Sequence, residues 1–137
     1  MSYTICYVSK ASENLTEEFI NEIFEKTVKK NNLKNINGIL LEGLGNFFQV
    51  LEGDKTIIED LYQNSILKDN RHSGVFEIIR RETEFNVFSD YSSNFNVVKT
   101  PSDLRRIQEY LSRTRYNSTS EKIKRLLTPF ISAPAEL

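Results

Sequence analysis

Three segments in the first half of the chain have the hydrophobic pattern of β-strands. They cover residues 2–9, 36–42 and 47–52. Because side chains along a strand point alternately to the two faces of a sheet, Tyr3, Ile5 and Tyr7 of the first segment share one face. Residues 43–46 contain two glycines and join the second segment to the third, which predicts a β-hairpin at this point of the chain.

Two other segments repeat their apolar residues every three or four positions, as one face of an α-helix does. The first runs from residue 16 to residue 30, begins with acidic residues and closes with two lysines, in agreement with the helix dipole. Asn31 and Asn32 predict its end. The second helix is predicted from about Lys55 to Leu67.

Two more strands are predicted at residues 74–82 and 93–99. The resulting order, β-α-β-β-α-β-β, is the ferredoxin-like arrangement with one additional strand, so we expect an α+β fold. In this arrangement both helices lie on one face of the sheet, and their shared groove is the natural site for a flat ligand. The other face of the sheet is left open.

Pro101 marks a boundary, and we expect a domain over residues 1–100 followed by a helical extension over 101–137. The extension carries two apolar stripes at helical spacing. They consist of Leu104, Ile107 and Leu111, and of Ile123, Leu126, Leu127 and Phe130. A helix that is apolar on one side only must pack on a partner, and the open face of the sheet is the predicted partner for both.

Composition adds few constraints to this picture. The 137 residues suffice for one domain with its own core, and a net charge of −1 favours neither nucleic acid nor a membrane surface as partner. Residues 101–137 hold seven Lys and Arg against four Asp and Glu, which fits an acidic partner and a solvated helix face equally well. With one cysteine, no membrane-length apolar run and no signal-peptide pattern, we expect a cytoplasmic protein.

The motifs of the common enzyme classes are absent from the sequence. There is no phosphate-binding glycine loop, no nucleophile elbow and no pairing of Cys and His at the spacing of a metal site. His72 is the single histidine, and its place after a helix end is more typical of a capping or surface residue than of a catalyst. We therefore expect a protein that is not an enzyme and binds no metal.

The third strand contains an amide that needs a partner. Phe47 and Gln49 share one face, whereas Glu52 marks the opposite face as the one expected to meet water. Gln49 would then lie in the core, where an unpaired amide costs about 1–3 kcal/mol. A backbone group could satisfy it; so could Tyr7, if the first strand neighbours the third, or a ligand edge of mixed polarity. Asn31 would direct a second amide to the same groove.

Here the residues resemble the BLUF family, blue-light receptors that bind flavin. The resemblance covers about residues 2–99 and is carried by blocks that follow one another in the order, and close to the spacing, of the family. They are Tyr7-Val8-Ser9, Asn31 seven residues before Gly38, Asn35-Ile36-Asn37-Gly38-Ile39-Leu40-Leu41, Phe47-Phe48-Gln49-Val50-Leu51-Glu52-Gly53 and Asp69-Asn70-Arg71-His72. Several blocks in the same order make the match more specific than one short motif.

The resemblance implies a non-covalent flavin, usually FAD and alternatively FMN, with its ring between the two helices. Ile23 and Ile66 match apolar walls against the ring. Asn31 matches a residue that bonds the pyrimidine edge of the flavin. Lys30 stands beside it where the family often has another polar residue, and Asp69 would help at the same end.

The resemblance also implies a photochemical pair. Tyr7 matches the electron donor of the family, and Gln49 matches the amide that links the donor to flavin N5 and O4. In the family, blue light drives transient electron and proton transfer from the tyrosine. The glutamine then changes its hydrogen bonds, and this rearranged network is the signal, without net turnover of a substrate.

Three positions depart from the family pattern. A tryptophan found in many members corresponds to Tyr91, and the associated methionine corresponds to Ser93. On the second helix, Ser65 stands where relatives often have Arg or His, after an apparent one-residue insertion. The first two changes concern signal output and recovery rate, and the third concerns binding of the flavin or its phosphates. Because Tyr7 and Gln49 are retained, we expect the primary photochemistry to survive.

These observations predict a short blue-light photoreceptor. Its output would pass through the 104–130 segment, within a homo-oligomer or to an unidentified downstream regulatory protein. The three departures keep a second interpretation open, a light-insensitive ferredoxin-like interaction module that has lost flavin or output coupling. A small enzyme that uses Tyr7 or His72 is a third interpretation, although the sequence offers no second catalytic group to support it.

Overall fold

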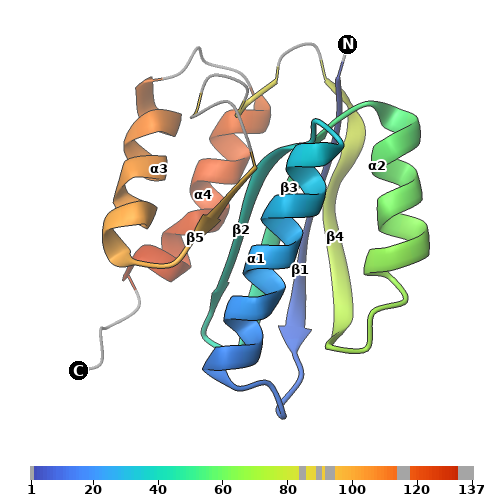
Figure 1. Cartoon of the computed structure of the whole chain (residues 1–137). Coiled ribbons are helices and arrows are strands. Elements are labelled where there is room, and N and C mark those ends of the chain that lie inside the picture. The colour runs from blue at the N-terminus through green and yellow to red at the C-terminus, as the bar shows by residue number, and fades with distance from the viewer. Residues whose placement is uncertain (1, 84–85, 89–90, 92–94, 114–117, 133–137) are drawn as a thin grey trace.

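A five-stranded sheet forms the centre of the structure (Figure 1). The computed structural model describes residues 2–83, 86–88, 91, 95–113 and 118–132. The strands are β1 (Ser2–Ala11), β2 (Asn37–Gly43), β3 (Asn46–Gly53), β4 (His72–Thr83) and β5 (Phe95–Val98). They lie in the order β4-β1-β3-β2-β5; β5 is parallel to β2, and the other neighbouring pairs are antiparallel. The first strand therefore lies beside the third, as the candidate site requires.

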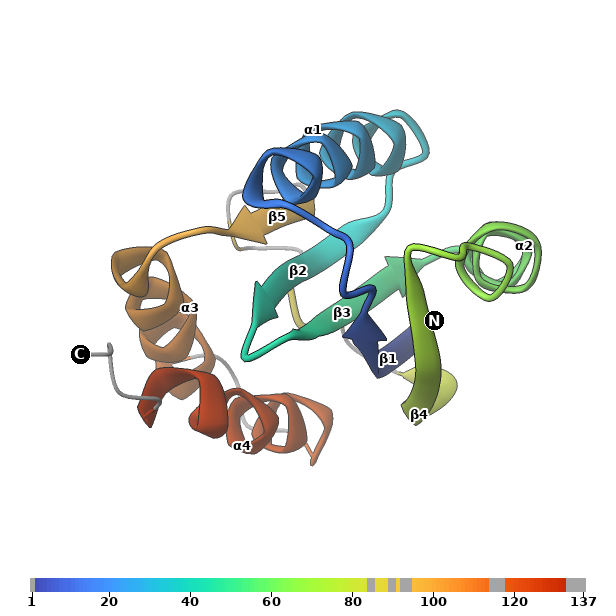
Figure 2. The same cartoon turned by 90° about the horizontal axis from the view of Figure 1, so that it is seen from below.

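The helices form one layer on each face of the sheet. They are α1 (Glu17–Leu33), α2 (Lys55–Leu61), which continues into the π-helical turn η1 (Tyr62–Ile66), α3 (Pro101–Arg113) and α4 (Ser118–Ser132). Figure 2 shows α1 and α2 on one face and α3 and α4 on the other. This confirms the predicted α+β fold with its additional strand and two C-terminal helices. None of the helices in the described residues combines the length and apolar character needed to cross a bilayer.

Each face of the sheet has its own apolar core. On the α1 and α2 side, Ile5 and Leu51 of the sheet pack with Ile58 of α2, and all three are fully buried. On the other side, the predicted stripes of α3 and α4 cover the sheet, with buried residues Ile107, Leu111, Ile123 and Leu127. Burial of each such side chain contributes about 1.5–3 kcal/mol, so both helix layers are held mainly by these contacts.

The first helix extends further than its sequence pattern indicated. Its start is fixed by Thr16, whose hydroxyl accepts a hydrogen bond from the Phe19 N–H at 3.2 Å. The predicted end after residue 30 is wrong by about one turn, since α1 continues to Leu33. Asn31 therefore belongs to the last turn of the helix, where its carbonyl oxygen accepts from the Ile36 N–H at 2.9 Å as the chain enters β2.

The second helix widens before it ends. The N–H of Leu67 donates to the carbonyl oxygen of Tyr62 at 2.9 Å, a bond that spans five residues and defines the π-helical turn. Such a turn holds one extra residue while the helix continues in the same direction. Ser65, beside which the sequence indicated a one-residue insertion, lies within η1. The predicted strand at 93–99 is observed as Phe95–Val98, and residues 93 and 94 lie outside the described residues.

The prediction that Glu52 faces water is wrong. The helices α3 and α4 cover the second face of β3, so Phe48, Val50 and Glu52 are all fully buried. The Glu52 carboxylate accepts hydrogen bonds from the N–H groups of Val87 and Phe88. Burial raises the pKa of this carboxyl to about 7, although the two hydrogen bonds oppose the rise.

Because of Glu52, the folded protein should lose stability as the pH rises from about 4.5 to about 7. In this window the unfolded carboxyl has released its proton whereas the folded one still holds it, so each rise in pH favours unfolding. The loss is at most about 3 kcal/mol. Urea unfolding across this range measures it. Glu52→Gln should remove this part of the slope, and an unchanged slope in the variant would contradict the assignment.

Gly38 of β2 lies close against the backbone of β3. Its φ is +140°, and a Cβ atom at this position would lie 1.8 Å from the carbonyl oxygen of Val50. Gly38→Ala should therefore force the two strands apart and lower the free energy of unfolding by about 3 kcal/mol or more. Gly74→Ala is the control, because its φ of +59° is also strained but its Cβ would meet no atom within 4 Å. The control should cost only about 1 kcal/mol, and equal losses in urea unfolding would refute the close approach.

Candidate functional site

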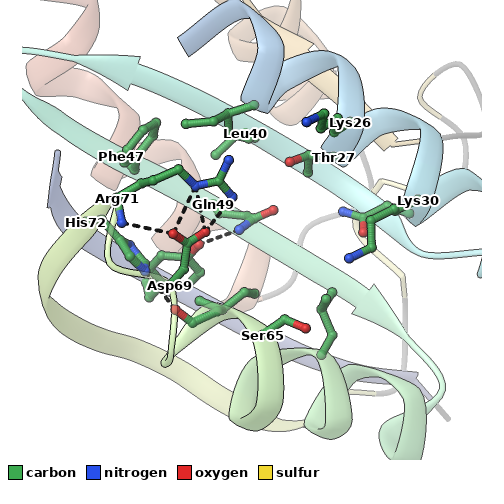
Figure 3. Close-up of a pocket in the computed structure, with 15 residues that line it drawn as sticks. Lys26, Thr27, Lys30, Leu40, Phe47, Gln49, Ser65, Asp69, Arg71 and His72 are labelled. Atoms are coloured by element: carbon green, nitrogen blue, oxygen red, sulfur yellow. Dashed lines mark hydrogen bonds and ion pairs between the residues drawn. The ribbon is translucent and has the colours of Figure 1, made fainter. Parts of the chain in front are cut away.

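A cavity of about 190 Å³ lies between α1 and α2, with the sheet as its floor (Figure 3). All seven site residues predicted from the sequence line it. They are Tyr7, Ile23, Lys30, Asn31, Gln49, Ile66 and Asp69. They come from four different elements and from the segment after η1, so the fold brings together residues that are up to 62 positions apart in the chain.

Tyr7 and Gln49 are bonded to each other at the floor of the cavity. The two residues are directly opposite in the antiparallel pairing of β1 with β3, which places their side chains on the same face. The Gln49 Nε2 donates to the Tyr7 hydroxyl at 2.5 Å. Tyr7 is 3% and Gln49 4% exposed, so this bond lies in a poorly solvated environment. The partner that Gln49 needed is thus Tyr7, as the neighbouring strands allow.

Burial strongly raises the pKa of the Tyr7 phenol, and the hydrogen bond from Gln49 only partly offsets this effect. The hydroxyl therefore keeps its proton throughout the physiological pH range. A neutral phenol in such a place can release an electron and a proton together, and it can also donate a hydrogen bond if the amide turns its oxygen toward it. The geometry allows two hydrogen-bond arrangements of the same pair.

Asn31 brings an unsatisfied donor into the cavity. The side chain is 2% exposed, and its Nδ2 has no hydrogen-bond partner. Its backbone carbonyl oxygen is already occupied by the N–H groups that end α1. A buried amide N–H without a partner costs about 1–3 kcal/mol, so its retention points to an acceptor that a ligand would supply.

Both helical sides of the cavity contribute an apolar side chain, and the α1 side also carries two lysines, Lys26 and Lys30. Ile23 of α1 and Ile66 of η1 provide an apolar side chain from each side. Lys30 lies on α1 together with Lys26 and Thr27, which the sequence analysis had not assigned to the site (Figure 3). Lys26 and Thr27 stand one helical turn before Lys30 and Asn31, so helical spacing was the signal that could have found them.

Asp69 lies at the cavity with its carboxylate held by Arg71. The guanidinium donates from Nε to Oδ1 at 2.9 Å and from the terminal nitrogen to Oδ2 at 2.6 Å, and the Arg71 backbone N–H adds a bond at 2.9 Å. The hydrogen bond from the Arg71 side chain is the largest reason why the pKa of Asp69 is lowered. Asp69 is therefore ionised, and Arg71, another lining residue missed from the sequence, shares its charge.

His72 lines the same cavity and bridges two of its elements. Its Nε2 lies 2.8 Å from the carbonyl oxygen of Ile66, which can only accept, so Nε2 carries the proton. The Ser9 hydroxyl then donates to Nδ1 at 2.6 Å. The capping interpretation of His72 is thus confirmed at the end of η1, but its ring also lies 6.0 Å from that of Tyr7 and forms part of the cavity lining.

A second buried tyrosine lies behind the first. The ring centroids of Tyr7 and Tyr62 are 6.0 Å apart, and the Tyr62 hydroxyl donates to Glu77 at 3.1 Å. Arg80 pairs with the same carboxylate at 3.2 Å and lies over the Tyr62 ring. Tyr62 belongs to the π-helical turn η1, and its place beside Tyr7 could not be read from the spacing of the sequence alone.

Comparison with known proteins bears directly on this arrangement. The family model described as "BLUF: Sensors of blue-light using FAD" matches residues 2–94. The chain belongs to the BLUF family. The resemblance noted in the sequence is therefore confirmed, and the cavity between α1 and α2 lies wholly within the matched segment.

Three relatives illustrate the breadth of the family. The photoactivated adenylate cyclase subunit alpha-like protein FB of Euglena gracilis is 30% identical over 129 residues, which cover 94% of this chain and 12% of that protein. The structure of Klebsiella pneumoniae BlrP1 with FMN and cyclic diGMP has a TM-score of 0.72 and 28% identity over 96% of this chain and 35% of the other. The photo-activated state of BlsA has a TM-score of 0.68 and 22% identity over 97% and 96% of the two chains.

The three relatives differ in how much of their own length this chain covers. This chain spans about an eighth of the cyclase relative and about a third of the BlrP1 chain, but nearly all of BlsA. BLUF domains are sensors rather than enzymes, and this chain corresponds to the BLUF part of the longer relatives. At 22% identity the likeness to BlsA concerns the fold.

The positions that depart from the BLUF pattern lie in different places. Tyr91 packs on the ring of Tyr110 in α3, 4.9 Å between centroids, and joins the core on the sheet face opposite Gln49. It therefore packs inward, on the face of the sheet opposite Tyr7 and Gln49. Ser93 lies outside the described residues. Ser65 lines the cavity from η1.

The residues of the cavity fit a flavin. Its ring system is flat and largely apolar, with a polar edge of carbonyl oxygens and ring nitrogens, and the apolar side chains of Ile23 and Ile66 suit the faces of such a ring. The unpaired Nδ2 of Asn31 suits one of its carbonyl oxygens. Gln49 offers a donor and an acceptor from the same amide. The fit rests on the unpaired donor, which nothing else in the described part of the chain satisfies.

Proposed function

We propose that this protein is a blue-light receptor that holds FAD or FMN non-covalently between α1 and α2 and signals by rearranging the hydrogen bonds of Tyr7 and Gln49. The observation that carries the proposal is the bond between these two buried side chains at the floor of a cavity that also contains an unpaired amide. A core that needed only stability would not retain such polar groups, because apolar side chains of similar size would cost less.

The binding roles follow the lining of the cavity. Ile23 and Ile66 would contact the two faces of the flavin ring, and Asn31 would donate to a carbonyl oxygen of its pyrimidine edge. Lys30 would add positive charge near that edge. Asp69 would act through Arg71, since its oxygens already accept from the guanidinium. BlrP1 is described with FMN, which supports a flavin in general and leaves both FAD and FMN as candidates.

Bound flavin supplies the absorption of blue light and an acceptor for one electron and one proton. Tyr7 is positioned to provide both, because its neutral phenol lies in the same cavity. In the observed arrangement the Gln49 NH₂ group donates to the Tyr7 hydroxyl, so the phenolic proton can pass to the amide only when Gln49 turns its oxygen toward Tyr7. When the proton and electron return, the amide can present either its NH₂ group or its oxygen to Tyr7, by rotation or by tautomerisation. In a poorly solvated site the two arrangements differ enough to persist as distinct states.

The signal would leave the site through protein contacts. The helices α3 and α4 cover the face of the sheet opposite the cavity, so a change in β3 reaches them directly. We expect the receptor to act within a homo-oligomer or on a downstream regulatory protein. A light-insensitive module remains the alternative, favoured by Ser65 at the place where relatives often carry a basic residue. If this alternative holds, the protein should bind no flavin or should show no spectral response to light.

Replacing Asn31 should weaken flavin binding without loss of stability. Asn31→Ala removes the unpaired donor, so affinity for FAD should fall about 5–30-fold, the equivalent of one hydrogen bond. Flavin fluorescence titration measures the affinity. Asn32→Ala is the control: its Oδ1 accepts from the Phe95 N–H at 2.9 Å, a structural bond outside the cavity. The control should lower the free energy of unfolding but keep the affinity, and equal affinity for wild type and Asn31→Ala would contradict the role of Asn31.

The photochemical roles can be tested by absorption spectroscopy. The purified protein loaded with FAD should be yellow, and under blue light its absorption should shift to the red and return in darkness. Tyr7→Phe and Gln49→Leu should still bind flavin but lose the shift. Tyr3→Phe is the control, because Tyr3 shares the same face of β1 but bonds to Glu59. An intact shift in either site variant would refute the assigned roles, and a protein that takes up no FAD would favour the light-insensitive module.

A further inference from the structure

A fully buried carboxylate lies on β3, three residues after Gln49 and on the opposite face. One oxygen of Glu52 accepts from the Val87 N–H at 2.5 Å and the other accepts from the Phe88 N–H at 2.8 Å. Its side chain is inaccessible to solvent. Two consecutive backbone N–H groups thus bind one carboxylate, which holds the segment 86–88 against the strand that carries the photochemical amide.

The Glu52 carboxyl group has no cation beside it among the residues that the structure describes. The ion pairs of these residues involve other acids, and the groups that oppose the rise in the pKa of Glu52 are the two backbone N–H groups. A buried acid with this arrangement is costly compared with an apolar residue. Its position therefore calls for a role other than stability, and the groups that it holds indicate what that role is.

The segment 86–88 is held from its other side by α3. The Tyr110 hydroxyl donates to the carbonyl oxygen of Val87 at 2.6 Å. The ring of Phe88 stacks on that of Tyr110 with centroids 6.2 Å apart, and Tyr91 packs on the same ring. Val87 and Phe88 thus connect β3 to α3: their N–H groups face Glu52, and the Val87 carbonyl and Phe88 ring face Tyr110. Figure 2 shows β3 in the middle of the sheet with α3 and α4 beyond it.

We propose that Glu52 is the positioning residue that couples the cavity to α3, by holding Val87 and Phe88 in place in one state of β3 and releasing them in the other. The proposal rests on the proposed function, since Gln49 is the group that would move the strand. The two residues are about 10 Å apart along β3. Two hydrogen bonds from neighbouring N–H groups to one carboxyl group tolerate little displacement, so a shift of β3 by about 1 Å would break at least one of them.

Release of Val87 and Phe88 would have a defined consequence for α3. The Tyr110 side chain would lose the fixed position of its acceptor and of its stacking partner, so the contact of α3 with the sheet would loosen. Val87 and Phe88 therefore have two arrangements, held by Glu52 or released from it. Both the amide of Gln49 and the contacts of α3 can shift the balance between the two. A partner that binds α3 in one arrangement would thereby sense the state of the cavity.

Hydrogen exchange of the backbone amides tests the coupling. In wild-type protein without flavin, the Val87 and Phe88 amides should be protected. Glu52→Gln keeps the shape but replaces one accepting oxygen with an NH₂ group, so exchange at these two amides should rise at least tenfold, with a smaller rise in α3. Glu42→Gln is the matched control: its carboxylate on neighbouring β2 accepts from the Gly45 N–H within its own hairpin. The control should leave exchange at Val87, Phe88 and α3 unchanged.

The same measurement on FAD-loaded protein separates this proposal from the proposed function. In wild type, blue light should shift the absorption and also raise exchange at Val87, Phe88 and in α3. In Glu52→Gln the red shift should persist, whereas exchange in α3 should already be high in darkness and change little with light. Absence of the red shift in wild type would refute the proposed function. A red shift with no change of exchange at these amides in wild type would overturn the coupling alone.

A second variant acts from the opposite side of the segment. Tyr110→Phe keeps the stacked ring but removes the bond to the Val87 carbonyl, without touching the buried carboxylate. It should keep the red shift and reduce the light-dependent change in α3 at least twofold, even if Glu52→Gln proves unable to fold. An α3 response equal to that of wild type would overturn the proposal.

Discussion

The hydrogen bond between Gln49 and Tyr7 is the interaction on which the rest of the account depends. It exists because β3 is inserted between β1 and β2, and because the register of β1 with β3 sets these two residues directly opposite each other. A slip of one residue would turn one of the two side chains to the other face. The sheet topology therefore has a chemical consequence, since it fixes which phenol meets which amide.

The two faces of β3 have different chemistry but share one backbone. Toward α1 and α2 the strand presents Gln49 to a cavity, and toward α3 and α4 it presents Glu52 to the segment 86–88. A strand buried on both faces is held tightly in position, so a small displacement on one side cannot be absorbed by solvent on the other. This two-sided burial is the physical reason why a hydrogen-bond change at Gln49 would be felt by the C-terminal helices.

Much of the fold followed from periodicity. The order of strands and helices, the hairpin before β3 and the apolar stripes of α3 and α4 were all predictable, because each depends on local spacing and on the need to bury one face. The burial of Glu52 was not predicted. The expected packing of the two C-terminal helices on the open face of the sheet nevertheless implied that Glu52, which lies on that face, is buried. The error arose because a charged residue was taken to mark a wet face, whereas the two N–H groups that satisfy it come from a segment 35 positions away.

The candidate site was predictable only in part, and for a similar reason. The resemblance to the BLUF family pointed to seven of the fifteen residues that line the cavity, which single spacing patterns could not have brought together. Lys26 and Thr27 could have been added from the helical repeat. Arg71 and His72 stand in the block that begins at Asp69, but their contacts could not be predicted from it, because these depend on the π-helical turn and on the pairing of β4 with β1. Contacts set by tertiary register leave no periodic signal in the sequence.

The central claim is that a flavin and the Tyr7 phenol share the amide of Gln49 in the cavity between α1 and α2. The most direct measurement is the NMR spectrum of the side-chain amides of Gln49 and Asn31 during titration with FAD in darkness, followed by blue light. Both amides should shift when FAD is added, and under light the Gln49 signals should move again and return in darkness while those of Asn31 move much less. Side-chain signals of Gln49 and Asn31 that do not respond to FAD would contradict the account.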